Sequence, residues 1–364
     1  MSDPHNILII QPSWVGDAVM ATPMLRAIRN RYPAARITYL MRRYVKPVYA
    51  GMPWANRLLT FRPTRHRGGG ALSLGHRLRA GNFDLAVLLP NSFKSALTCK
   101  VAGIERIIGY DRDGRGMLLT DKLIPLRHDG QYVPTPIVGY YLALARYLGA
   151  ADRDTRMELF VTDAERREAI DVLGRAGLDA GIERPGVRSG KPLVILNPGA
   201  QYGAAKCWLP EYFAAVNDRL VDELGATVIV SSAPRERKIV DEIARLAKRP
   251  FVDTGKLGPS LGAVKEIIRR ADLMITNDTG PRHIAAAFGV PVVTVFGPTH
   301  PEWTEIDFPH ERKVAVKVFC GPCQRKTCPL DHRCMTRVTP AMVFERAVEL
   351  LLPSRSRVSL PLAT

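Results

Sequence analysis

The sequence predicts an α/β protein with parallel sheets, divided into two domains. Short apolar segments, Gly/Pro-marked loops and amphipathic helices alternate along both halves of the chain. The apolar segments show no polar alternation, which is typical of parallel strands buried on both faces. The length of 364 residues suggests two domains of ordinary size, and a hydrophobic fraction of 46% allows each to bury a core.

The first half begins with an apolar strand at residues 6–10. An amphipathic helix at 18–31 follows, with one apolar face formed by Met20, Met24, Leu25 and Ile28. The other elements expected here are strands at 36–40 and 85–89 and helices near 95–101 and at 134–148. The run from Gly68 to Gly70, flanked by basic residues, predicts a mobile loop.

The second half repeats this order of elements. We expect strands at 193–196, 227–231, 273–276 and 292–295, and helices at 211–224, 235–247, 261–270 and 281–288. The segment 181–192 is rich in Gly, Pro and charge and is the expected linker. The first domain is then 1–180 and the second 193–340, with a C-terminal helix at 341–353 that can pack back on the first domain.

Basic charge is concentrated in the first half. Residues 1–150 hold 21 Lys and Arg against 8 Asp and Glu, whereas residues 151–364 hold 31 against 27, for a net charge of +17. The asymmetry predicts an anionic partner for the first half: nucleic acid, a lipid headgroup surface or a phosphorylated substrate. The alternative is a solvated basic surface.

The N-terminus lacks a basic segment before its apolar run, which ends at Ile10, so it does not resemble a secretory signal. No run of eighteen apolar residues follows that would span a membrane. We therefore expect a cytoplasmic protein, whose six cysteines are not structural disulfides.

In open α/β sheets ligands bind beyond the carboxyl ends of the strands, so the loops there are the candidate site. The first loop, Gln11-Pro-Ser-Trp-Val-Gly-Asp17, lacks the G-x-G-x-x-G pattern of NAD enzymes. Asp17 can be a helix N-cap or a general base that removes a proton from an attacking hydroxyl, and both readings remain open.

Three loops of the second half carry further candidates. Lys206 offers a point charge to phosphate, or is a solvated lysine. Glu236 can accept hydrogen bonds from a ribose, or can interact favourably with the positive end of its own helix dipole. In Thr276-Asn-Asp-Thr-Gly-Pro-Arg-His283, the amides of Thr279 and Gly280 begin a helix and suit a diphosphate. In the same loop, Asp278 can hold sugar hydroxyls and His283 can simply be packed.

Taken together, the loops resemble glycosyltransferase family 9, and within it the heptosyltransferase II group. The resemblance runs from about Ile7 to about Val348 and rests on four motifs in order: Gly16-Asp17…Pro23, Asn197-Pro-Gly…Lys206-x-Trp208, Asn277-Asp-Thr-Gly-Pro-x-His283 and Phe296-Gly-Pro-Thr-x-Pro-x-Trp303. One departure is Cys207-Trp208-Leu209-Pro210, where the family pattern has a basic residue before Trp and Pro directly after it.

The resemblance implies a GT-B fold, two Rossmann-like domains facing a central cleft. It implies ADP-heptose as donor, the first heptose of the lipopolysaccharide inner core as acceptor, inversion in one displacement and no required cofactor. Asp17 would be the general base and Lys206 would neutralise the diphosphate. The remaining donor-binding residues would be Glu236, Asp278, Thr279, Gly280 and His283. The basic first domain would also contact the anionic cytoplasmic face of the inner membrane.

Four of the six cysteines fall in Cys320-x2-Cys323-x4-Cys328-x5-Cys334. Four thiolates with a C-x2-C start suit a structural zinc ion, although the later spacings are not those of a standard ribbon, and His310 or His332 could substitute as ligands. An iron–sulfur cluster and four free thiols are the alternatives. In each case the distance in sequence from the donor motifs predicts a structural role.

Three other function classes compete with this assignment. The first is another GT-B transferase, including heptosyltransferase I or III. The second is a nucleic-acid-binding protein, which the basic charge suggests but which lacks any accompanying binding signature, so no nucleic-acid partner is expected. The third is a noncatalytic sugar- or lipid-binding module, in which Asp17 would be dispensable.

Overall fold

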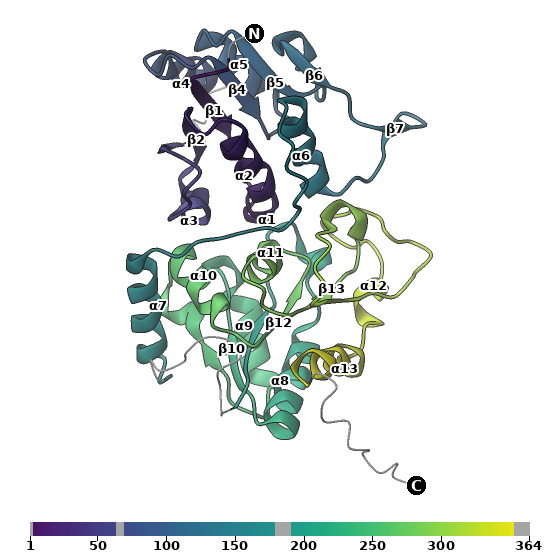
Figure 1. Ribbon diagram of the computed structural model, residues 1–364. Helices are drawn as coiled ribbons and strands as arrows, with labels where there is room; N and C mark the ends of the chain where they lie inside the picture. Colours follow the sequence, from purple (N-terminus) through teal and green to yellow (C-terminus); the bar gives the residue numbers. More distant parts are fainter. Residues whose placement is uncertain (1–2, 63–68, 179–190, 353–364) are drawn as a thin grey trace. The chain divides into compact units, whose positions relative to one another are not determined.

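The computed structural model describes residues 3–62, 69–178 and 191–352, which form two compact units (Figure 1). The first unit is Met1–Phe160 with Glu302–Asp307, and the second is Val161–Pro301 with Phe308–Thr364. The division therefore falls at Phe160 and not near residue 180. The expected linker at 181–192 lies outside the described residues except for its last two positions.

The first unit contains a six-stranded sheet in which every neighbouring pair is parallel. The strand order is β3-β2-β1-β4-β5-β6. The bounds are β1 Asn6–Ile10, β2 Arg36–Arg42, β3 Arg57–Phe61, β4 Leu85–Leu88, β5 Arg106–Tyr110 and β6 Asp121–Leu123. A separate antiparallel hairpin consists of β7 Arg127–His128 and β8 Gln131–Tyr132.

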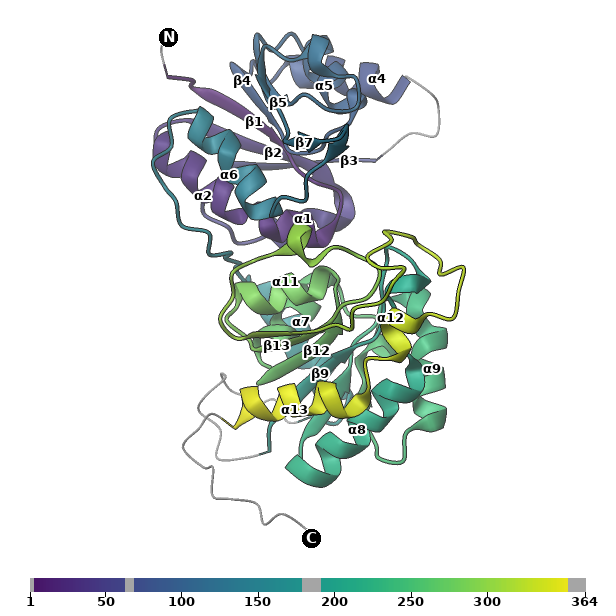
Figure 2. The ribbon, with the colours of Figure 1, turned by 90° about the vertical axis from the view of Figure 1, so that its right-hand side faces the viewer.

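Helices cover both faces of this sheet (Figure 2). One face packs α4 and α5 against Leu8, Ile10 and Leu88, and the opposite face carries α2 and α6. The helices are α1 Val15–Met20, α2 Thr22–Arg31, α3 Lys46–Tyr49, α4 Gly69–Arg79, α5 Phe93–Val101 and α6 Ile137–Tyr147.

Two local expectations are corrected in this unit. The helix expected at 18–31 is two helices, α1 and α2, which meet at Ala21. Pro23, in the first turn of α2, has no N–H for a continuous helix and so favours a new start there. Gly69 and Gly70 begin α4 and do not form a loop, while Gly68 lies outside the described residues.

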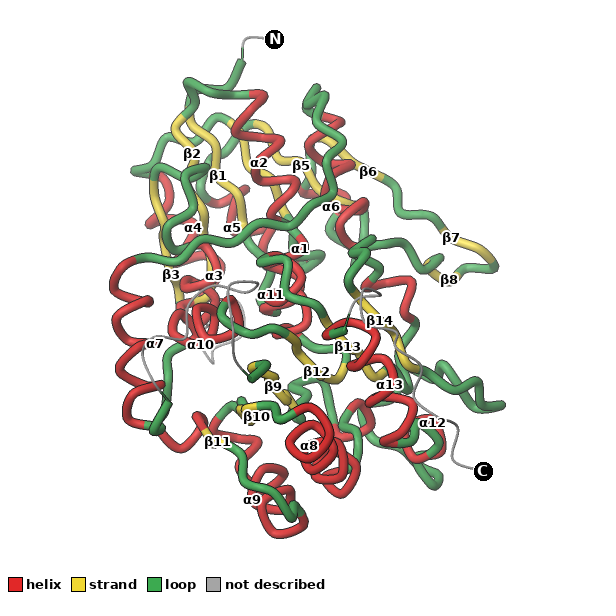
Figure 3. Tube along the Cα trace, turned by 60° about the horizontal axis from the view of Figure 1, so that its bottom comes forward, coloured by secondary structure: helices red, strands yellow, loops and turns green. Residues whose placement is uncertain are grey.

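The second unit has a six-stranded sheet with the same order, β11-β10-β9-β12-β13-β14, again parallel throughout. Figure 3 shows its helices around the strands. The strands are β9 Leu193–Asn197, β10 Thr227–Val230, β11 Val252–Asp253, β12 Leu273–Asn277, β13 Val292–Val295 and β14 Glu311–Val314. The helices are α7 Asp163–Arg175, α8 Pro210–Leu224, α9 Arg237–Leu246, α10 Leu261–Arg269, α11 Gly280–Ala287, α12 Arg333–Thr336 and α13 Pro340–Leu351.

The C-terminal helix α13 belongs to the second unit. Its residues Val343, Phe344 and Ala347 are buried in one core with α8 and the strands, so its apolar face is used within the second unit. The helix α7 also belongs here, because Lys265 of α10 pairs with Glu165 of α7 at 3.1 Å between Nζ and Oε2. The packing of α7 on α10 explains why the division falls earlier than expected.

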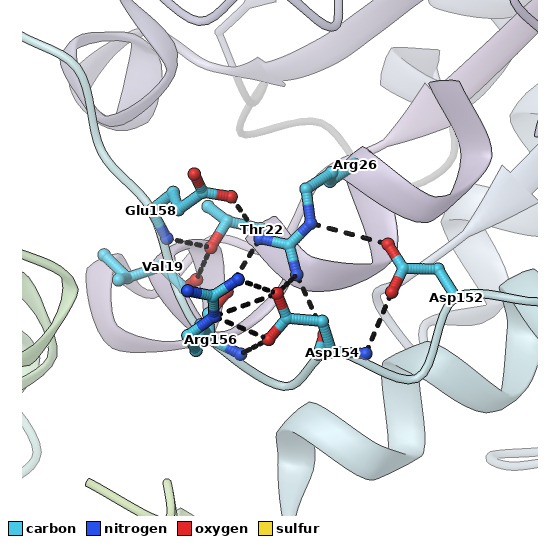
Figure 4. A network of polar contacts seen from close by, with 7 residues as sticks. All are labelled: Val19, Thr22, Arg26, Asp152, Asp154, Arg156 and Glu158. Atoms are coloured by element: carbon cyan, nitrogen blue, oxygen red, sulfur yellow. Dashed lines mark hydrogen bonds and ion pairs between the residues drawn. The ribbon is translucent and has the colours of Figure 1, made fainter. Parts of the chain in front are cut away.

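The segment that leaves the first unit is tied to α2 by Arg26 (Figure 4). The Arg26 guanidinium donates to the carbonyl oxygens of Asp154, at 2.9 Å, and Arg156, at 3.1 Å, and pairs with the Glu158 carboxylate. The backbone N–H of Glu158 donates to Thr22 Oγ1 at 3.1 Å. The extended chain up to Phe160 is therefore fixed on the first unit before α7 begins.

Both sheets share a topology in which chain connections diverge from two central strands. These are β1 and β4 in the first unit and β9 and β12 in the second. In open α/β sheets this divergence is where ligands bind. Among the residues that the structure describes, no helix is long and apolar enough to span a membrane.

Candidate functional site

The candidate donor site lies at the carboxyl ends of β9, β10 and β12 in the second unit. The loops that follow these strands carry Lys206, Glu236 and Asp278 respectively. Parallel strands end at the same edge of the sheet, so these residues, far apart in sequence, are brought to one place. Every donor-binding candidate from the sequence except His283 lies on a loop or helix start at this edge.

Two asparagines cross-link the central loops. Asn197, at the end of β9, donates from Nδ2 to Thr276 Oγ1 at 3.0 Å and to Thr279 Oγ1 at 3.3 Å. Asn277, at the end of β12, donates from Nδ2 to the Pro198 carbonyl oxygen at 2.7 Å. Each amide thus reaches into the other strand's loop, which fixes the two loops relative to each other.

Lys206 is held against Asp278. Lys206 Nζ lies 2.6 Å from Asp278 Oδ2 and 2.8 Å from the Asp278 carbonyl oxygen. The side chains are 11% and 3% exposed, so this pair is largely removed from water. Burial alone would raise the pKa of Asp278, but the charges of Lys206 and then Arg282 outweigh it and lower that pKa to about 2. Asp278 is therefore ionised at neutral pH.

Several protein donors already occupy the Asp278 carboxylate. Besides Lys206, Thr299 Oγ1 donates to Oδ2 at 3.1 Å and Arg282 NH1 donates to Oδ1 at 3.1 Å. An ionised carboxylate offers about four lone-pair sites. Asp278 is thus first a fixed anchor for its neighbours, and has little remaining capacity for the sugar hydroxyls that the sequence assigned to it.

The start of α11 leaves its first N–H groups without a side-chain cap. Thr279 is the N-cap residue, and its side chain makes no capping bond. Its Oγ1 instead accepts the hydrogen bond from Asn197. The first N–H groups of a helix have no partner within the helix and carry its positive end, a combination that binds phosphate. The geometry at Thr279 and Gly280 therefore fits the diphosphate seat predicted from the sequence.

Glu236 lies directly against the loop after β9. A β-carbon at Gly199 would overlap the Glu236 carboxyl group, which shows how close the two residues are. The same carboxylate accepts from the Ala233 N–H at 2.8 Å, so it also caps its own short helix. Burial raises the pKa of Glu236 against the opposing effect of that hydrogen bond. Both sequence interpretations of Glu236 are thus compatible with its position.

His283 lies inside the fold, one turn into α11. It is 2% exposed, and Nδ1 has no hydrogen-bond partner in the described part of the chain. Burial, followed by the charge of Arg282, lowers the pKa of His283 to about 3. A neutral, buried imidazole cannot offer positive charge to a diphosphate, so packing is its better-supported role.

Asp17 belongs to the first unit and is the third residue of α1. The N-cap position is taken by Trp14, so Asp17 is not the N-cap that sequence alone allowed. Burial, and then the charge of Asp17, raise the pKa of the Tyr141 phenol on α6. Asp17 follows β1, at the point where the connections of the first sheet diverge.

The cysteine segment, defined here as residues 318–334, packs over the Lys206 loop. The Ala205 N–H donates to the Lys326 carbonyl oxygen at 3.0 Å, and Tyr202 Oη donates to the Gln324 carbonyl oxygen at 2.6 Å. His332 Nε2 lies 2.8 Å from the Ala205 carbonyl oxygen. Sequence distance was thus a poor guide, since this segment supports the donor loop directly.

The zinc site expected in this segment is not supported. Cys320, Cys323, Cys328 and Cys334 are free thiols. Across residues 3–62, 69–178 and 191–352, no three His, Cys, Asp or Glu side chains are arranged to hold a metal ion. His332, an alternative ligand in the sequence interpretation, is engaged with the Ala205 carbonyl.

Sequence reasoning missed Arg282 and Glu311. Arg282, the third residue of α11, donates to Asp278 and also to Glu311 at the start of β14. The four-residue spacing from Asp278 to Arg282 is a helix-pair signal that could have identified the first contact. Glu311 lies on an edge strand that was not predicted, so nothing in the sequence indicated the second.

Comparison with known proteins shows one consistent similarity. The protein-family model described as "Glycosyltransferase family 9 (heptosyltransferase)" matches residues 71–333 of this chain. The chain is 30% identical to lipopolysaccharide heptosyltransferase 2 of Escherichia coli (strain K12), over 95% of this chain and 99% of that protein. It is 31% identical to the Salmonella typhimurium protein of the same name, over 95% of this chain and 98% of that protein.

A solved structure extends the similarity to three dimensions. The structure of E. coli ADP-heptose lps heptosyltransferase II is similar with a TM-score of 0.76 and 28% identity, covering 95% of this chain and 98% of that one. E. coli heptosyltransferase WaaC with ADP, at 18% identity and a TM-score of 0.67, shares the fold. The similarity thus extends over both units.

Proposed function

The chain belongs to glycosyltransferase family 9, and from that premise we propose that it transfers heptose from ADP-heptose to the first heptose of the lipopolysaccharide inner core. It is a heptosyltransferase most similar to the heptosyltransferase 2 proteins. The observation that carries the donor assignment is the Lys206–Asp278 pair beside the uncapped start of α11. Together they offer an ammonium and helix N–H groups to one diphosphate.

In the proposed reaction, the acceptor hydroxyl gives its proton to the Asp17 carboxylate as its oxygen bonds to the anomeric carbon. The bond from that carbon to the diphosphate breaks in the same step, so configuration inverts and ADP leaves with the bonding electrons. Lys206 and the N–H groups of Thr279 and Gly280 stabilise the negative charge that develops on the diphosphate. Glu236 accepts hydrogen bonds from the ribose.

The acceptor is assigned to the first unit because of its charge and its topology. Residues 1–150 carry a net charge of +13, from 21 basic and 8 acidic residues. A phosphorylated or carboxylated core oligosaccharide and an anionic membrane surface are both attracted by such an excess. Asp17 follows β1 at the point where the first sheet's connections diverge, which suits a base for the acceptor.

The test is a reaction of the purified protein with ADP-heptose and three acceptors: Kdo2-lipid A, its mono-heptosylated form and its di-heptosylated form. The proposal expects one added heptose on the mono-heptosylated acceptor, detected by mass. Addition only to Kdo2-lipid A or only to the di-heptosylated acceptor would instead identify a heptosyltransferase I or III activity. Heptosyltransferase III activity is kept as an alternative because the E. coli (strain K12) heptosyltransferase 3 is 29% identical over 79% of this chain.

The donor is tested separately by thermal unfolding with ADP, UDP or GDP. A ligand that binds only the folded state raises the unfolding temperature. The proposal expects stabilisation by ADP, and stabilisation by UDP alone would contradict it.

A further inference from the structure

Four charged side chains of alternating sign form a row that ends at the candidate donor site. Lys206 pairs with Asp278, Asp278 pairs with Arg282, and Arg282 pairs with Glu311. Arg282 NH1 lies 3.1 Å from Asp278 Oδ1. Arg282 donates from Nε to Glu311 Oε1 at 2.6 Å and from NH2 to Glu311 Oε2 at 2.9 Å. Only Lys206, at the end of the row, is needed for the proposed chemistry.

The inner part of this row is shielded from water. The Arg282 side chain is 0% exposed, and the side chains of Asp278 and Glu311 are 3% and 2% exposed. Thr294 Oγ1 donates to Glu311 at 2.5 Å, and the Arg282 guanidinium lies 5.0 Å from the centre of the Phe296 ring. Charges in such surroundings interact more strongly than surface charges, because water does not screen them.

Asp278 is shared between two cations. Its Oδ2 faces Lys206 and its Oδ1 faces Arg282. Arg282 is likewise shared between two anions, with its two-bonded contact to Glu311 and its single contact to Asp278. The extent to which Asp278 neutralises the charge of Lys206 therefore depends on Arg282. The attraction between Arg282 and Asp278 in turn depends on Glu311.

We propose that Arg282, held by Glu311, is a positioning residue that sets how much positive charge Lys206 presents to the donor diphosphate. By engaging one oxygen of Asp278, Arg282 prevents that carboxylate from neutralising Lys206 completely. The inference rests on the proposed function, because it requires that Lys206 faces a diphosphate. It assigns a role to two residues that touch neither substrate nor reacting atoms.

The proposal predicts opposite effects for the two partners of one ion pair. In Arg282→Met the Asp278 carboxylate loses one of its cations and neutralises Lys206 more fully, so ADP binds about tenfold more weakly. In Glu311→Gln, Arg282 turns its charge towards Asp278 and leaves Lys206 freer, so ADP binds as tightly as to the unaltered protein or more tightly. A purely structural role for the pair would weaken binding in both variants.

The experiment measures the dissociation constants of ADP and adenosine by calorimetric titration. Adenosine lacks the diphosphate, so its affinity should be the same for Arg282→Met as for the unaltered protein. The double variant Arg282→Met/Glu311→Gln removes the buried, unbalanced Glu311 charge of the single variant. It should regain thermal stability without regaining ADP affinity, and this keeps the test decisive if the single variant folds poorly.

Lys206→Met separates this inference from the proposed function. If the unaltered protein does not bind ADP, or if Lys206→Met binds it equally well, the proposed donor site is wrong. If Lys206→Met loses affinity while Arg282→Met and the double variant bind ADP normally, the donor site stands and the positioning role is overturned. The positioning role would also be overturned if Glu311→Gln weakened ADP binding as much as Arg282→Met does. The same holds if Arg282→Met lost as much affinity for adenosine as for ADP.

Discussion

Lys206 and Asp278 are 72 positions apart in the sequence, yet Lys206 Nζ lies 2.6 Å from Asp278 Oδ2. The contact exists because β9 and β12 are neighbours that end at the same edge of the second sheet. Asp278 is ionised and buried there, with its pKa lowered to about 2. The same ion pair therefore stabilises the folded sheet and sets the charge at the candidate donor site.

The first prediction concerns the acid stability of the protein. The pKa of Asp278 is lower in the folded chain than its ordinary value of 3.8. Its ionisation therefore stabilises the fold above about pH 4, and this stabilisation is lost as the pH falls towards 2. The change is about 2 kcal/mol, since one pKa unit corresponds to about 1.4 kcal/mol.

The measurement is urea unfolding of the unaltered protein and of Asp278→Asn between pH 7 and pH 3. Asp278→Asn should be less stable at neutral pH, and the difference between the two proteins should narrow as the pH falls. A difference in unfolding free energy that is the same at every pH would show that the charge of Asp278 does not stabilise the fold.

The second prediction concerns Asp17. Asp17→Asn keeps the size of the side chain but cannot accept a proton, so we expect heptose transfer to slow by about 10²- to 10⁴-fold. ADP affinity should be unchanged, because the donor residues lie on the second unit. Asp129→Asn is the matched control, since the Asp129 side chain is 92% exposed. Full transfer activity in Asp17→Asn would contradict the general-base role, whereas no transfer by the unaltered protein would favour the noncatalytic module.

The sequence was sufficient to predict the central strands of both sheets and which loops meet at the edge of the second sheet. Short apolar strands followed by Gly- and Pro-containing loops indicated parallel α/β units, and the structure confirms them. Lys206, Asp278 and Thr279 could be assigned to one site because each follows a buried strand. Strand ends in a parallel sheet meet at one edge, so the pattern alone predicts that such loops come together.

Contacts that depend on unpredicted elements could not be anticipated. The partner of Arg282 is Glu311, 29 residues later, and their contact requires that β14 adds to the sheet beside β13. The cysteine segment reaches the Lys206 loop through backbone carbonyls such as that of Lys326. Backbone contacts of this kind carry no signature in residue type, so spacing suggested a distant role for the segment.

The third prediction concerns Gly199. A β-carbon there would overlap the Glu236 carboxyl group, which is the flexible end of a side chain and can move away. Gly199→Ala should therefore fold, but it should displace Glu236 and weaken adenosine binding several-fold. Gly174→Ala is the matched control: Gly174 lies in α7 with nothing near the added carbon, and the change should stabilise the protein by about 0.5–1 kcal/mol. Unchanged adenosine affinity in Gly199→Ala would contradict the role of Glu236 at the ribose.

The fourth prediction concerns Gly203, where the obstacle is backbone and not a side chain. A β-carbon at Gly203 would overlap the Lys326 carbonyl oxygen, which itself accepts the hydrogen bond from the Ala205 N–H. This overlap is removed only if the cysteine segment moves away from the Lys206 loop. Gly203→Ala should therefore lower the unfolding free energy by about 1–3 kcal/mol, as overpacking does elsewhere, which is more than Gly199→Ala.

The same change should also weaken ADP binding, because the segment that moves holds the loop carrying Lys206. Chemical unfolding and ADP titration of Gly203→Ala, beside Gly174→Ala, measure both effects. Loss of stability with normal ADP affinity would mean that the Lys206 loop keeps its position without the cysteine segment. Loss of both would establish that residues 318–334 support the donor site mechanically, through backbone contacts, whatever the state of their thiols.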